Sequence, residues 1–160
     1  MGSSTAASHR EHCSLRNPVL SMEESGPRIV FICKSDCDSY ETLHGLLKRA
    51  GCQVLAARTA TAGFSLVRSQ EFEMVVLDWP VGEPSGIHLC RALRALVPKA
   101  PIFFFSYIPY RGVVDMALEA GASGVFAKPG EIGALLSAVA ASSGATLNIE
   151  APGLEMAEAV

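Results

Sequence analysis

Three side chains with chemical potential directly follow short apolar runs in this 160-residue chain: Asp78, Ser106 and Lys128. An apolar run of this kind is typical of a buried strand. The carboxyl ends of parallel strands meet at one edge of an open α/β sheet, so we expect the three side chains to converge there. The sequence therefore predicts a site that combines an acid, a hydroxyl and an amine, with Asp78 at its centre.

The elements that must position these residues are repeated strand–helix units. From Arg28 onward, short apolar runs alternate with segments of helical periodicity, which is typical of a parallel sheet covered by helices. We predict an α/β fold with a five-stranded, doubly wound parallel sheet of (βα)5 type. The expected strands cover residues 29–33, 53–57, 74–78, 102–106 and 124–127, and the later helices are expected near 61, 85–96, 111–120 and 131–141.

Capping residues mark the ends of several expected helices. Asp38 and Glu41 form a pair like a capping box, and Gly51 ends the first helix. Ser85 is expected to cap the third helix, in which apolar residues recur at helical spacing as far as Leu96.

Length and composition fit one compact domain. With 49% hydrophobic and 18% charged residues, the chain can bury a core without disulfides or metals. We assign residues 27–141 to this domain, residues 1–26 to a disordered N-terminal tail and residues 142–160 to a flexible C-terminal tail. Both tails are rich in small and polar residues and have no periodic apolar pattern.

Charge and cysteine spacing exclude several classes of function. A formal net charge of −3 offers no overall basic face, so we expect no nucleic-acid binding. The five cysteines have no metal-site spacing, and Cys33 and Cys37 are expected to be packing residues. No apolar stretch reaches about 18 residues, so we expect a cytoplasmic protein that does not enter membranes. The segment after the first strand contains no glycine, which argues against a nucleotide-binding enzyme.

Four segments of the chain stand in the order and at the intervals of a known family. They are residues 75–79 followed by Ser85-Gly86, Pro101-Ile102 leading to Ser106, residues 117–124, and Lys128-Pro129. Through them, residues 28–141 resemble the receiver domain of bacterial two-component response regulators. The resemblance implies the chemotaxis-type, flavodoxin-like fold and a role in phosphorelay signalling without enzymatic turnover.

The same resemblance implies roles for the three strand-end residues. Asp78 would accept a phosphoryl group from a histidine kinase or phosphotransfer protein, Ser106 would donate a hydrogen bond to the phosphoryl oxygens, and Lys128 would pair with them. These residue types suit the reaction, since a carboxylate nucleophile needs fixed donors and a cation around the transferred group. The face made by the fourth helix, fifth strand and fifth helix would contact a downstream protein. A homodimer is left open.

The chain departs from the family where the metal should bind. Receiver domains carry two adjacent acids after the first strand, and here Lys34 and Ser35 stand at those positions. Asp36, one position later, is a secondary candidate acid, and the metal-binding carbonyl would belong to Pro80. Mg²⁺ usually relies on one or two carboxylates. A lysine in the pocket would repel the cation, since even two unit charges about 4 Å apart interact by roughly 4 kcal/mol when the effective dielectric is near 20. We therefore predict no firm cofactor and disfavour Mg²⁺.

Two interpretations follow from this combination. The first is a single-domain response regulator that is switched by phosphorylation of Asp78. The second is a phosphorylation-independent pseudo-receiver, a protein–protein interaction module in which Lys34 replaces the metal and pairs with Asp78. Tyr107 and Tyr110 form an exposed aromatic stretch after Ser106, which could cap the pocket, contact a partner or pack above the sheet.

Overall fold

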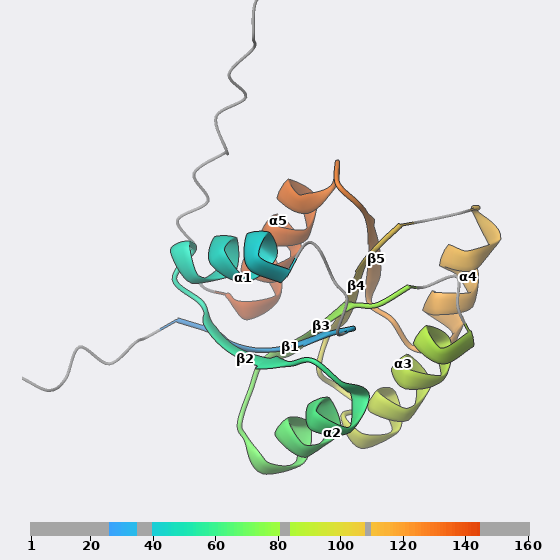
Figure 1. The fold of residues 1–160 in the computed structure, drawn as a ribbon, viewed down its shortest axis with the longest axis horizontal. Helices are drawn as coiled ribbons and strands as arrows, with labels where there is room; N and C mark the ends of the chain where they lie inside the picture. The colour runs from blue at the N-terminus through green and yellow to red at the C-terminus, as the bar shows by residue number, and fades with distance from the viewer. Residues whose placement is uncertain (1–25, 35–39, 81–83, 108–109, 145–160) are drawn as a thin grey trace, which may run out of the picture.

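A single parallel sheet organises the chain (Figure 1). The computed structural model describes residues 26–34, 40–80, 84–107 and 110–144. The strand order is β2-β1-β3-β4-β5, and all four neighbouring pairs are parallel. The strands are β1 Arg28–Cys33, β2 Gln53–Ala57, β3 Met74–Asp78, β4 Ile102–Ser106 and β5 Gly124–Ala127. This is the predicted doubly wound (βα)5 fold.

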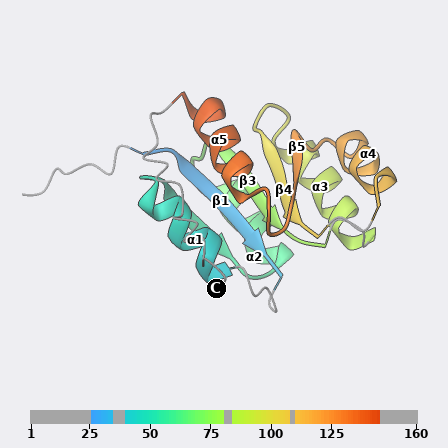
Figure 2. The same ribbon diagram turned by 90° about the horizontal axis from the view of Figure 1, so that it is seen from above.

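The five helices cover the sheet on both faces (Figures 1 and 2). Their bounds are α1 Tyr40–Arg49, α2 Ala60–Ser69, α3 Pro84–Leu96, α4 Gly112–Glu119 and α5 Ile132–Ser143. Helices α1 and α5 pack on one face, and α2, α3 and α4 pack on the other. Among the described residues, no helix is long and apolar enough to cross a bilayer.

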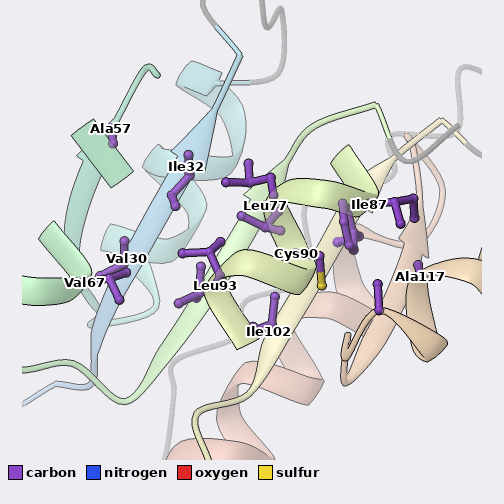
Figure 3. Packing of buried hydrophobic residues seen from close by; sticks show 14 of the residues in the cluster. Val30, Ile32, Ala57, Val67, Leu77, Ile87, Cys90, Leu93, Ile102 and Ala117 are labelled. Carbon is purple, nitrogen blue, oxygen red and sulfur yellow. The ribbon is translucent and has the colours of Figure 1, made fainter. Parts of the chain in front are cut away.

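The strand alternation divides the core into two clusters. Val75 and Leu77 of β3 belong to the cluster beneath α2, α3 and α4, which Figure 3 shows. Met74 and Val76 belong to the cluster beneath α1 and α5. Every residue of β3 is buried, as expected of a central strand covered on both faces. Each fully buried aliphatic side chain stabilises the fold by about 1.5–3 kcal/mol.

Several helix boundaries differ from the sequence prediction. Helix α2 begins at Ala60, slightly before the expected start near residue 61. The Thr59 hydroxyl accepts a hydrogen bond from the backbone N–H of Ala62 over 3.1 Å and so caps the helix at this point. Helix α3 begins at Pro84, so Ser85 lies inside the helix and the prediction that it caps it was wrong. Proline favours the first helical position, since its fixed φ suits the helix and it has no N–H to satisfy.

Further differences lie near helix ends. Leu96 is 39% exposed because it is the last residue of α3, beyond the part that packs on the sheet. Helix α5 continues to Ser143, two residues past the predicted end, and Gly144 follows in the left-handed conformation. The predicted cap at Asp38 lies outside the described residues.

The three cysteines of the described segments, Cys33, Cys52 and Cys90, are buried. Cys33 is fully buried and its thiol contacts the Ala57 carbonyl oxygen, which agrees with the predicted packing role. Burial raises the pKa of Cys52 and of Cys90 to about 11, so both thiols are protonated at neutral pH and are poor nucleophiles. Cys37 lies outside the described residues.

One guanidinium ties α3 to the segment before β5. Arg94 donates hydrogen bonds to the carbonyl oxygens of Val97, Ala100 and Gly121 over 2.7–2.9 Å. Gly121 has a φ of +103°, and a Cβ there would lie 2.6 Å from Cγ of Arg94. Only glycine therefore allows this backbone conformation and the close approach of the arginine.

We predict that Arg94→Lys lowers the free energy of unfolding by roughly 1.5–3 kcal/mol, because an ammonium cannot reach all these carbonyl oxygens at once. Arg91→Lys, on an exposed position of the same helix, is the matched control and should stay within about 0.5 kcal/mol of the parent. Urea denaturation measures both variants. Equal stability of Arg94→Lys and Arg91→Lys would contradict this account of the guanidinium.

Candidate functional site

The register of the sheet brings the ends of four strands to one edge. Asp78, the last residue of β3, pairs with Cys33 at the end of β1. On the other side of β3 lies β4, whose last residue Ser106 pairs with Ala127 at the end of β5. Lys128 follows immediately after β5. The acid, the hydroxyl and the amine are thus carried by three adjacent strands, as the sequence predicted.

Asp78 and Lys128 form a buried ion pair across this edge. The Lys128 ammonium contacts Oδ1 of Asp78. The Lys128 side chain is only 9% exposed and the Asp78 side chain only 3%. Two charges removed from water must compensate each other, since each alone would carry a large desolvation penalty. The pair therefore fixes the positions of both functional groups.

Ser106 completes the set on the intervening strand. Its side chain is almost fully buried, and its hydroxyl donates to the Tyr107 carbonyl oxygen over 3.3 Å. The Ser106 carbonyl oxygen in turn accepts the Lys128 N–H over 3.0 Å. The backbone that carries the hydroxyl is therefore tied directly to the residue that carries the amine.

Lys34 lies beside Asp78 through its backbone. The Lys34 N–H donates to the Asp78 carbonyl oxygen over 3.2 Å, so the residue at the first acidic-pair position adjoins the candidate acceptor. The Asp78 carboxylate forms an ion pair with Lys128. An ion pair between Lys34 and the same carboxylate stays a prediction. Ser35 and Asp36 lie outside the described residues.

The loop after β3 packs tightly on α3. Nε1 of Trp79 donates to the Ser85 hydroxyl over 3.3 Å. The Pro80 carbonyl oxygen lies so close to Gly86 that a Cβ on this glycine would be 2.6 Å from it. The carbonyl expected to serve a metal is therefore held by a close contact with the helix.

The described donor set does not fit Mg²⁺ well. Within the described segments, no three His, Cys, Asp or Glu side chains gather to hold a metal. Asp78 supplies a carboxylate that already contacts Lys128, and Pro80 supplies a neutral carbonyl. A cation that favours several oxygen ligands would have to compete with the ammonium for this carboxylate.

Two aromatic rings lie close to the Lys128 amine. The Lys128 Nζ lies 5.4 Å from the centre of the Phe105 ring and 5.6 Å from that of Tyr107. These residues line a pocket of about 820 Å³ that runs along α1 and reaches the amino end of α5, together with Leu46 and Ile132. Phe105 was not among the predicted site residues. The signal was available, because Phe105 and Tyr107 flank Ser106 and alternate residues of a strand share a face.

We predict that Lys128→Met destabilises the protein by roughly 3 kcal/mol, because it leaves the Asp78 carboxylate buried without its counter-ion. The double variant Asp78→Asn/Lys128→Met should recover most of this loss, since it removes both charges. Urea denaturation of the parent, the two single variants and the double variant completes the cycle. A double variant no more stable than Lys128→Met would contradict the ion-pair account.

Two known proteins are similar to this chain in sequence. The sensor histidine kinase AruS of Pseudomonas aeruginosa is 31% identical over 114 residues, which are 62% of this chain and 11% of that protein. The transcriptional activator protein ExaE of Pseudomonas putida is 32% identical over 92 residues, or 56% of this chain and 43% of that protein. This chain thus spans less than half the length of either relative.

A solved structure and a family model match the same region. The receiver domain of the Francisella response regulator 1452 superposes with a TM-score of 0.65 at 19% identity, covering 74% of this chain and 98% of that one, which supports the fold. The family model for the response regulator receiver domain matches residues 30–140. Apart from the first two residues of β1, the matched region contains all five strands. It also contains both members of the Asp78–Lys128 pair. The chain belongs to the response regulator receiver domain family of two-component phosphorelay systems.

Proposed function

We propose that this chain is a phosphorylatable receiver in which Asp78 accepts a phosphoryl group from a histidine kinase or a phosphotransfer protein. The observation that carries this proposal is the buried Asp78–Lys128 ion pair, with Ser106 on the strand between the two residues. A carboxylate is a competent phosphoryl acceptor when a cation and a hydrogen-bond donor neutralise the transferred oxygens.

The transfer exchanges one set of contacts for another. A carboxylate oxygen of Asp78 attacks phosphorus, the bond from phosphorus to the donor's imidazole nitrogen breaks, and the imidazole leaves with the electron pair. The product is an acyl phosphate on Asp78. Lys128 then moves from the carboxylate to the phosphoryl oxygens, and the Ser106 hydroxyl turns from the Tyr107 carbonyl oxygen towards them.

This exchange provides a route for the signal. Lys128 follows β5 and precedes α5, and Ser106 precedes the segment that leads to α4. A change of partner at both residues therefore acts on the two connections that border the face made by α4, β5 and α5. We propose this face as the surface read by a downstream protein, in a signalling module without its own enzymatic turnover.

A second candidate is a phosphorylation-independent pseudo-receiver. It is favoured by the lysine at position 34, whose backbone adjoins Asp78, and by a carboxylate that already has a cationic partner in Lys128. In this alternative, the Lys34 ammonium takes the place of the metal and pairs with Asp78, and the fold presents one conformation to a protein partner without phosphorylation. No step is assigned to Mg²⁺ in either candidate, because the described donors fit it poorly.

Incubation with acetyl phosphate, with and without Mg²⁺, tests the first candidate. We expect a mass gain of one phosphoryl group on the parent and none on Asp78→Asn, because the amide cannot form the acyl phosphate. Intact-protein mass spectrometry measures the gain. No gain from acetyl phosphate or from a phosphorylated histidine phosphotransfer protein would contradict the proposal.

Lys34→Asp distinguishes the two candidates. If the lysine excludes the cation, the variant should bind Mg²⁺ or take up phosphate faster in its presence, since a charge of +1 becomes −1 next to Asp78. Lys48→Asp, an exposed charge reversal on α1, is the matched control. Uptake by Lys34→Asp but not by the parent would support the pseudo-receiver. If neither the parent nor Lys34→Asp binds Mg²⁺ or takes up phosphate, Lys34 is not what keeps the cation out of the site.

A further inference from the structure

The Lys128 ammonium lies beside both a carboxylate and aromatic rings. On one side it contacts the Asp78 carboxylate, and it also lies within 5.6 Å of the ring centres of Phe105 and Tyr107. A cation within about 6 Å of a ring centre is attracted by the negative face of the π system, and the attraction grows when the cation is removed from water. With a side chain only 9% exposed, Lys128 meets both conditions.

The two rings differ sharply in how they are held. Phe105 is 2% exposed and packs in the core cluster beneath α1 and α5. Tyr107 is 70% exposed and directly follows β4. Phe105 is therefore a fixed wall, whereas Tyr107 can leave the amine without disturbing the core.

We propose that Phe105 and Tyr107 form an aromatic clamp that holds the Lys128 ammonium on Asp78, and that Tyr107 is the movable half whose departure releases the amine. This inference rests on the proposed function for its consequence, since Lys128 must leave the carboxylate before it can neutralise a phosphoryl group. Tyr107 is thus a positioning residue that sets how readily the site opens.

The pocket beside the clamp supplies the approach. Tyr107, Phe105 and Lys128 line the pocket of about 820 Å³ that Leu46 and Ile132 bound on the helix side. Asp78 is only 3% exposed, so a phosphoryl donor can reach its carboxylate only if the site opens. Movement of the Tyr107 ring away from Lys128 opens the site towards this pocket.

The reactivity of the Lys128 amine tests the clamp directly. The full chain is treated briefly with acetic anhydride, and acylation of each lysine is followed by peptide mass spectrometry. In Tyr107→Ala we expect Lys128 to react roughly 2- to 10-fold faster than in the parent, the range that a partly desolvated cation–π contact implies. Tyr107→Phe keeps the ring and should keep the parent rate.

Internal and matched controls separate the clamp from general loosening. Lys48 and Lys99 are exposed and should react equally in all variants. Tyr110→Ala removes another exposed tyrosine, 58% exposed, and should leave the Lys128 rate unchanged. An unchanged Lys128 rate in Tyr107→Ala, or an equal rise in Tyr107→Phe, would overturn the clamp.

A second measurement tests its consequence for phosphoryl uptake. With acetyl phosphate, the initial rate of Asp78 modification should rise in Tyr107→Ala and not in Tyr107→Phe. Faster Lys128 acylation with an unchanged phosphorylation rate would overturn the gating role. If no variant is phosphorylated, the proposed function fails, whereas the acylation result still decides the clamp because it needs no phosphoryl transfer.

Discussion

A carboxylate and an ammonium are buried together at the carboxyl edge of the sheet, and neither could stay there without the other. The Asp78–Lys128 pair joins the ends of β3 and β5 across β4. Because a small shift would leave an isolated buried charge, the pair demands the correct register of all three strands. The apolar clusters on the two faces of the sheet supply the stability that holds this register.

The strands and the main site follow from the sequence for a simple physical reason. A central parallel strand is apolar throughout, so the first polar residue after it marks the edge of the sheet, as at Asp78 and Ser106. The first residues of the helices were harder to predict from the sequence, because residues near Thr59 and Pro84 are equally good candidates for the start of a helix. The Arg94 contacts could not be predicted, because they depend on how three separate loop carbonyls meet in space.

The same distinction explains what was missed at the site. Convergence of Asp78 and Lys128 needs only the topology of the sheet, but the choice of ion-pair partner depends on side-chain placement. The structure places the Lys128 ammonium on the Asp78 carboxylate, a direct contact that the sequence did not predict, and the pairing of Lys34 with this carboxylate stays a prediction. In the function that we propose, phosphorylation is an exchange of partners: Lys128, which the structure places beside Phe105 and Tyr107, gives up the carboxylate to reach the phosphoryl group.

The most direct test of this exchange is a crystal structure of the protein treated with beryllofluoride, which mimics a phosphoryl group on a carboxylate. The account predicts an adduct on Asp78, with the Lys128 ammonium moved from the carboxylate oxygen to within hydrogen-bond distance of a fluoride. An Asp78 without adduct at saturating beryllofluoride, still paired with Lys128, would contradict it.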